Sequence, residues 1–164
     1  MNKNPFPRAD LDRHEIWEIL VRHDFESFVA RDWSLMEPDF STGWFCGIDA
    51  HRSFDPQKWT IGFPTVQSYR DEWLLQAAEF SKIQLVGIGK LEFLYQACQL
   101  ETIEISENMA LAHKQFNGET KTVDDEIYSF CFQSLYQMTR YAGSWKIAGF
   151  VGYLPMDLIY NSGG

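Results

Sequence analysis

The feature that most constrains the fold is a change of hydrophobic period part-way along the chain. In the first half, apolar residues recur at the spacing of a helix, from Asp10 to about Ala30 and again after Pro64. From about Leu91 the sequence takes on the pattern of strands separated by turn residues. Helices followed by a block of strands predict an α+β domain.

Two helices are expected in the first half. Asp10 is the predicted N-cap of the first, which extends to about Ala30. Its apolar face carries Ile16, Trp17, Leu20, Val21 and Phe28. Residues 33–37 are expected to add one turn before Pro38. Pro64 is expected in the first turn of the second helix. Its buried face carries Val66, Tyr69, Trp73, Ala77 and Phe80.

The remaining segments are expected to form strands and loops. A short strand is predicted at 43–48, and the polar segment 51–62 is predicted to be a loop. The second half divides into four β-rich runs, at 91–106, 109–116, 126–141 and 144–155. The breaks after the first three runs fall at Glu107-Asn108, Asn117-Gly118 and Ala142-Gly143. Turn residues between β-rich runs predict an antiparallel meander.

Length and composition indicate one domain with a large aromatic content. At 164 residues the chain can bury a substantial core, and we expect a single domain over 1–164. The 13 Phe, 7 Tyr and 6 Trp favour sheet faces and the wall of an apolar pocket. Strands 91–106 and 126–141 carry apolar or aromatic residues on both alternating faces. One concave core cannot cover both faces, so we predict a homodimer.

The formal charge of −9 excludes several classes of partner. Nucleic-acid affinity comes mainly from Lys and Arg that neutralise phosphates, so no nucleic acid is expected. No apolar run approaches the ~20 residues of a spanning helix, and no membrane is expected. Residues 1–13 contain no apolar stretch typical of a signal peptide, which favours a cytoplasmic location.

No residue pattern predicts a metal or a cofactor. Cys46, Cys98 and Cys131 are far apart and odd in number, which is typical of reduced packing thiols. The four histidines show no metal-ligand spacing, and neither a glycine-rich phosphate loop nor a nucleophile elbow is present. Any site is therefore expected to work without a metal or a cofactor.

Asp24 is the most informative polar residue. Advancing 100° per residue places it near the centre of the apolar face of the first helix, where an unpaired carboxylate is costly. One interpretation is structural: a partner from elsewhere in the core, or a helix rotated enough for Asp24 to reach water. The other is a pocket acid with a raised pKa that donates a hydrogen bond or moves a proton.

Three further polar residues are candidates for acid–base chemistry. Asp49 follows the first predicted strand, and His51 lies two residues later; the alternative is a turn with solvated side chains. His113 alternates with Met109 and Leu111, so it is either a pocket base or a histidine of the core or dimer face.

Three segments carry a resemblance to a known fold family. They are ARDWSLMEPDF after the first helix (30–40), ISENMALAHKQF (105–116), and the final strand that opens with Gly-Ser-Trp-Lys-Ile (143–147). Together with the order of elements, they resemble the nuclear transport factor 2-like superfamily, which includes SnoaL-like cyclases, ketosteroid isomerases and scytalone dehydratases. The resemblance implies a strongly curved, mainly antiparallel sheet with the N-terminal helices in its concave face, around a deep apolar cone.

The resemblance also places individual residues. Asp24 falls where the isomerases carry the tyrosine of their oxyanion hole, and Asp49 falls near their aspartate base. Gln137 falls where they hold a second acidic donor, although a glutamine on the sheet surface is the alternative. Tyr95 falls close to the position of the catalytic histidine of the dehydratases, and Phe28 corresponds to the position of their helix tyrosine.

Two functional hypotheses follow. Tyr69, Trp73 and Trp17 are expected to line or floor the cone, together with Phe28, Tyr95 and Gln137. The first hypothesis is a cofactor-independent isomerase, dehydratase or cyclase acting beside a carbonyl, with Asp24 and Asp49 handling protons. The alternative is a non-catalytic module that binds an apolar small molecule or a partner protein in the same cone.

Overall fold

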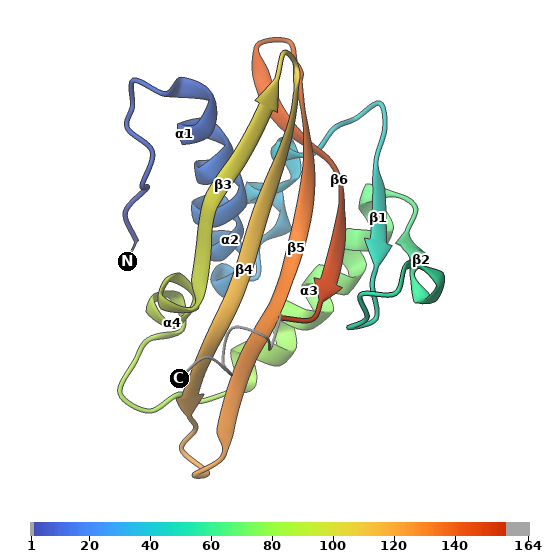
Figure 1. The fold of residues 1–164 in the computed structure, drawn as a ribbon. Coiled ribbons are helices and arrows are strands. Elements are labelled where there is room, and N and C mark those ends of the chain that lie inside the picture. The colour runs from blue at the N-terminus through green and yellow to red at the C-terminus, as the bar shows by residue number, and fades with distance from the viewer. Residues whose placement is uncertain (1, 157–164) are drawn as a thin grey trace, which may run out of the picture.

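A computed structural model describes residues 2–156; residue 1 and residues 157–164 of the expected single domain lie outside this range. Its helices and strands follow one another in the order shown in Figure 1. The helices are α1 (Leu11–Trp17), α2 (Asp24–Ala30), α3 (Val66–Lys82) and α4 (Lys90–Ala97). The strands are β1 (Cys46–Asp49), β2 (Thr60–Phe63), β3 (Cys98–Ser106), β4 (Met109–Lys121), β5 (Ile127–Tyr141) and β6 (Ser144–Leu154).

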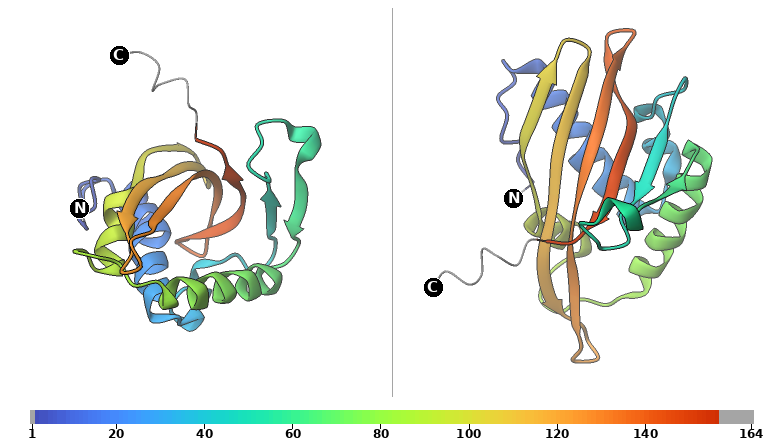
Figure 2. Two further views of the ribbon diagram at one scale, coloured as in Figure 1. Left: turned by 90° about the horizontal axis from the view of Figure 1, so that it is seen from below. Right: turned by 45° about the vertical axis from the view of Figure 1, so that its right-hand side comes forward.

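The six strands form one sheet in the order β2-β1-β6-β5-β4-β3. Neighbouring strands from β3 to β6 are antiparallel, and β1 runs parallel to β6. Seen from below, the sheet curls around the helices, and α3 runs along the open side of the curl (Figure 2). The expected α+β class, the antiparallel meander and the curved sheet around N-terminal helices are therefore confirmed.

The first helix begins and ends where predicted, but a π-helical segment interrupts its α-helical geometry. The Asp10 side chain caps it by accepting from the backbone N–H of Arg13, and Arg31, with φ of 56°, ends it. Between α1 and α2 lies a π-helical segment, η1 (Glu18–His23). A π turn holds more residues than an α turn, so it shifts the helical phase just before Asp24.

The second helix begins slightly later than predicted. Thr65 is the N-cap of α3, and its hydroxyl and that of Ser68 form a reciprocal capping box. Pro64 therefore precedes the cap instead of lying in the first turn. The helix buries Trp73, Ala77 and Phe80 on the face turned toward α2.

The connection between the two helices holds more structure than the sequence indicated. The expected single turn after the first helix is two short 3₁₀ segments, η2 (Trp33–Leu35) and η3 (Glu37–Asp39). The segment predicted as a loop contains the 3₁₀ turn η4 (Pro56–Lys58) and the edge strand β2. Three of the four β2 residues are exposed, so no alternation of burial marks the strand in the sequence.

The prediction of a strand from Leu91 is wrong for its first seven residues. They belong to α4, and β3 begins only at Cys98. The helix buries Phe93, Leu94 and Ala97. In the sequence these residues form part of a short apolar run. Such runs fit a buried strand and a buried helix equally well, and the packing of α4 against α2 and β4 decides between them.

The predicted turn at Asn117-Gly118 is also wrong, because β4 continues through it to Lys121. Here Gly118 provides room: a Cβ at this position would lie 2.5 Å from the Cβ of Ala97 on α4. The glycine therefore marks a close approach of strand and helix. The turns at Glu107-Asn108 and Ala142-Gly143 occur as predicted, with positive φ at Glu107 (54°), Ala142 (51°) and Gly143 (83°).

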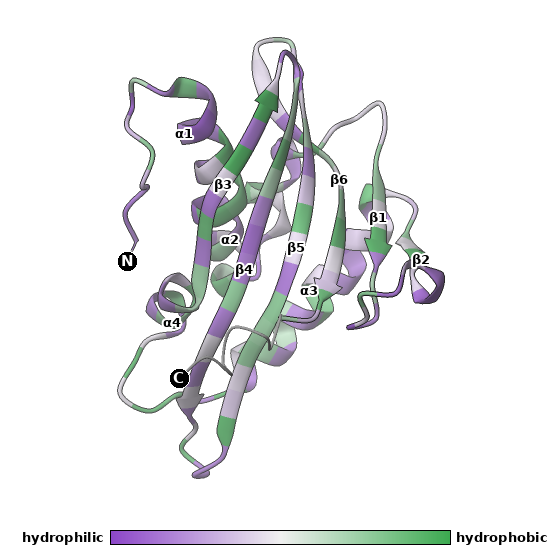
Figure 3. Ribbon diagram, in the orientation of Figure 1, coloured by the Kyte–Doolittle hydropathy of each residue, from purple (hydrophilic) through white to green (hydrophobic). Residues whose placement is uncertain are grey.

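The two faces of the sheet differ in burial. Hydrophilic and hydrophobic residues alternate along the strands (Figure 3). On β4 the concave face buries Ala110, Ala112 and Phe116, whereas Met109 and Leu111 on the convex face are exposed, as is Leu135 on β5. Within the described part of the chain, no helix is long and apolar enough to cross a membrane.

Replacing Gly118 by alanine is expected to lower the free energy of unfolding by about 1–3 kcal/mol, because the added methyl group overpacks the contact with Ala97. Urea unfolding of the variant and wild type measures the change. Gly43→Ala is the matched control, since nothing lies within 4 Å of a Cβ built there. Equal stability of the two variants would show that α4 moves away from β4 at no cost.

Candidate functional site

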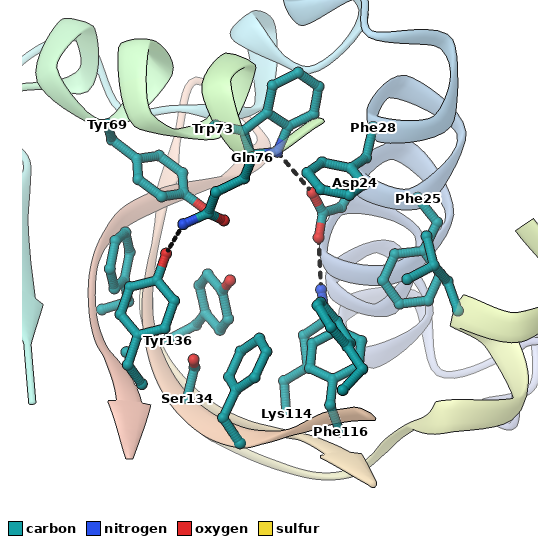
Figure 4. Close-up of a pocket in the computed structure, with 16 residues that line it drawn as sticks. Asp24, Phe25, Phe28, Tyr69, Trp73, Gln76, Lys114, Phe116, Ser134 and Tyr136 are labelled. Carbon is teal, nitrogen blue, oxygen red and sulfur yellow. Dashed lines mark hydrogen bonds and ion pairs between the residues drawn. The ribbon is translucent and has the colours of Figure 1, made fainter. Parts of the chain in front are cut away.

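A cavity of about 60 Å³ lies inside the curl of the sheet, between the helices and the concave faces of β4, β5 and β6 (Figure 4). Most of its wall is aromatic. The lining consists of Asp24, Phe25, Phe28, Tyr69, Trp73, Gln76, Leu94, Lys114, Phe116, Phe130, Phe132, Ser134, Tyr136, Phe150, Gly152 and Tyr153. The polar groups among these aromatic rings define what the cavity can bind.

The central polar feature is an ion pair between Asp24 on α2 and Lys114 on β4. The ammonium Nζ lies 2.7 Å from Oδ2 of Asp24. The Lys114 side chain is 1% exposed, and that of Asp24 is 16% exposed. The same ammonium donates to the backbone carbonyl of Leu20, and it lies 4.7 Å from the ring centroid of Phe25 and 5.1 Å from that of Phe116.

Lys114 keeps its charge because of this partner. Burial opposes the charged form and is the largest single influence, but the carboxylate of Asp24, together with Tyr136 and Cys98, raises the pKa of Lys114 above its ordinary value. A raised lysine pKa stabilises the folded state below the ordinary pKa near 10.4, and this contribution is lost only as the pH rises through the folded pKa. Lys114 therefore stays charged throughout the neutral range.

Asp24 holds a second donor on its other oxygen. The indole Nε1 of Trp73 on α3 donates to Oδ1 at 3.1 Å, so Asp24 lies between Trp73 and Lys114 (Figure 4). A carboxylate has about four lone-pair sites, which leaves Asp24 able to accept further hydrogen bonds from the cavity. One carboxylate thus joins α2, α3 and β4.

Three phenols complete the polar lining. Burial raises the pKa of Tyr69 well above its ordinary value, with further contributions from Tyr136 and Asp24. Burial also raises the pKa of Tyr136, and it raises that of Tyr153 to about 12 although Gln76 donates to the Tyr153 hydroxyl at 2.7 Å. All three remain protonated at neutral pH and are able to donate hydrogen bonds.

The structure brings only part of the predicted site together. Asp24, Phe28, Tyr69 and Trp73 share the cavity. Asp49 and His51 instead line an outer cleft at the end of β1, which shares Gln76 and Tyr153 with the cavity. There Asp49 Oδ1 accepts from the backbone N–H of His51 at 2.7 Å, and the His51 ring contacts the Thr60 hydroxyl at 2.8 Å. Asp24 and Asp49 therefore do not face one point.

Trp17 and Tyr95 lie in the core instead of the cavity lining. Trp17 is buried in α1, beneath the guanidinium of Arg22. Tyr95 is on α4 instead of a strand, and its ring packs edge-on against Phe25 at 5.3 Å between centroids. Tyr95 is buried on this helix and is not among the residues that line the cavity.

His113 and Gln137 lie on the convex face of the sheet. Nε2 of His113 lies 2.6 Å from the side-chain oxygen of Gln133. Gln137 pairs in register with Leu111 and lines an outer groove near Trp44. The period of two along a strand puts both on the side opposite Lys114 and Tyr136. Gln137 therefore lies on the surface of the sheet, which was the alternative given for it above.

Lys114 is the residue that sequence reasoning missed. The alternation of Ala110, Ala112, Lys114 and Phe116 places the lysine on the apolar face of β4 and was available in the sequence. A lysine on an apolar strand face requires a buried partner, just as Asp24 does on its helix. Residues 2–156 contain no group of three or more His, Cys, Asp or Glu side chains that would hold a metal ion.

Comparison with solved structures identifies the architecture. Aln2 from a Streptomyces species superposes with a TM-score of 0.57 at 13% identity, covering 98% of this chain and 99% of that one. A nuclear transport factor 2-like superfamily protein from Salmonella enterica gives 0.54 at 13% identity, covering 92% and 95%. A nuclear transport factor 2-like protein of unknown function from Shewanella baltica gives 0.51 at 16%, covering 91% and 96%.

This chain has the nuclear transport factor 2-like fold. The fold predicted from the three motifs and the order of elements is thereby confirmed. Identities this low establish the fold alone. No protein-family model and no curated protein sequence matches the chain.

Asp24→Asn is expected to lower the free energy of unfolding by about 3–5 kcal/mol, because it leaves the buried Lys114 ammonium without its counter-charge. Adding Lys114→Met should restore most of the loss, since an apolar side chain of similar length removes the stranded charge. Urea unfolding of both single variants and the double variant measures the coupling. This expectation differs from that for a neutral pocket acid, which would tolerate the amide.

The control is Asp71→Asn on α3, where the carboxylate is 69% exposed. This substitution should change the free energy of unfolding by less than about 0.5 kcal/mol. Wild-type stability of Asp24→Asn, or a double variant no more stable than the single one, would show that the pair does not form in solution.

Proposed function

We propose that the protein binds a small, mainly apolar molecule carrying one hydrogen-bond-accepting oxygen, with this oxygen in the cavity beside Asp24 and Lys114. The observation that carries this proposal is the contrast between an aromatic wall and a cluster of protonated donors within it. Tyr69, Tyr136 and the Lys114 ammonium supply donors, and the surrounding rings exclude water. An apolar pocket with a few convergent polar groups is the usual form of a small-molecule site.

Acid–base catalysis beside a carbonyl is the second candidate, as in an isomerase, dehydratase or cyclase. The observation favouring it is that Asp24 retains free lone pairs and 16% exposure in the same cavity as the phenol donors. Asp24 would accept a proton next to a carbonyl whose oxygen the phenols hold. Asp49 lies in the outer cleft and has no part in this scheme.

Acetophenone and ethylbenzene separate the polar from the apolar contribution, because they differ mainly in the carbonyl oxygen. We expect calorimetric titration to show tighter binding of acetophenone. Tyr136→Phe should weaken it by about 0.5–1.5 kcal/mol and leave ethylbenzene unchanged, because it removes one hydroxyl donor. Equal affinities for the two probes in the wild type would contradict the proposed donor cluster.

The same acetophenone complex in D₂O distinguishes binding from catalysis. A proton-abstracting Asp24 would exchange the methyl protons, measured by NMR, and the Asp24→Asn/Lys114→Met variant would abolish this exchange. Binding without any exchange above the solvent rate leaves the protein a binding module.

We also infer that two copies associate through the convex face of the sheet. Met109, Leu111 and Leu135 are exposed there on neighbouring strands β4 and β5, in an arrangement that a second copy would cover. The proposed cytoplasmic location rests on the sequence alone.

Leu111→Arg, at a side chain that is 57% exposed, is expected to leave the fold intact and shift the dimer toward monomer. Light scattering coupled to size-exclusion chromatography at micromolar concentration measures the mass of both proteins. A wild-type monomer with no dependence on concentration would overturn the inference.

A further inference from the structure

A second, apolar groove of about 430 Å³ adjoins the cavity, between α3 and β5. One wall is formed by Leu75 and Phe80 from α3 and by Ile83 just after it, and the other by Tyr128, Phe130 and Phe132 from β5. The ring centroids of Phe80 and Tyr128 lie 5.8 Å apart, where the helix approaches the strand.

The groove and the cavity adjoin one another. They share five lining residues, namely Phe28, Gln76, Phe130, Phe132 and Tyr153. The hydrogen bond from Gln76 to the Tyr153 hydroxyl lies at this boundary and joins α3 to β6. A ligand that reaches from Asp24 into the groove passes beside these shared residues.

The cavity alone is too small for a whole ligand of ordinary size. A water-sized group needs about 10–15 Å³ of such space, so about 60 Å³ accommodates only about four to six groups of this size. Ligand pockets usually measure about 300–1,000 Å³, and the groove by itself reaches this range. The greater part of a ligand would thus lie in the groove.

The chemistry of the groove fits an uncharged apolar chain. Its rim carries three charged residues, and each already has a partner: Arg52 donates to the carbonyl of Cys131, Glu72 accepts from Gln76, and Glu79 pairs with Lys82. Between them, Leu75 on the wall is 58% exposed. The groove therefore presents apolar surface where the cavity presents donors.

We propose that the natural ligand is an extended amphipathic molecule, with its oxygen-bearing end beside Lys114 and Tyr136 and an apolar chain along the α3–β5 groove. This deepens the proposed function and rests on it. Depth fixes the orientation, because the hydrogen-bonding groups lie in the cavity and the apolar walls lie in the groove outside it.

A series of methyl ketones with butyl, hexyl, octyl and decyl chains tests the proposal by calorimetric titration. Each methylene buried in the groove should raise the affinity about fourfold. Leu75→Glu should flatten this dependence for the longer chains and leave the butyl ketone unchanged, because it places a charge on the groove wall outside the cavity.

Leu35→Glu is the matched control, since Leu35 is 56% exposed and lines neither the groove nor the cavity. Affinity that does not depend on chain length in the wild type would overturn the extended ligand while the cavity proposal stands. Equal losses in the Leu75 and Leu35 variants would also overturn it. Failure of every ketone to bind would remove both proposals.

Discussion

The buried ion pair between Asp24 and Lys114 organises the interior of this fold. A lysine on the concave face of a curved sheet is tolerated only with a counter-charge, and Asp24 supplies it from the helix packed inside the curl. The same carboxylate accepts from Trp73, which fixes α3 relative to α2. The Asp24 carboxylate, which neutralises the buried Lys114, thus also lines the cavity.

This double role explains why the two functional hypotheses are difficult to separate from a single residue. A charge that holds elements together and a charge that contacts a ligand both produce a buried, hydrogen-bonded carboxylate. The phenols of Tyr69 and Tyr136 line the same cavity as this ion pair. The proposed binding site gives a role to the ion pair and to the phenols together.

The curvature of the sheet also divides the polar residues among separate environments. Asp49 and His51 belong to the end of β1 and face an outer cleft, whereas His113 and Gln137 lie on the convex face. Their sequence positions fit a catalytic cone, but the period of two along a strand and the position of β1 at the side of the sheet place them elsewhere. The candidate site consequently contains Asp24 but not Asp49, His51, His113 or Gln137.

The sequence by itself determined the division into a helical first half and a mainly β second half, the Asp10 cap, two of the three predicted turns and the burial of Asp24, because these depend on local periodicity and turn chemistry. Only the tertiary structure decided that residues 91–97 form a helix and that Gly118 continues a strand, since packing of α4 against β4 chooses between two locally acceptable conformations. The tertiary structure was also needed to identify the partner of Asp24. Lys114 lies 90 residues further along the chain, and only the curl of the sheet brings the two together.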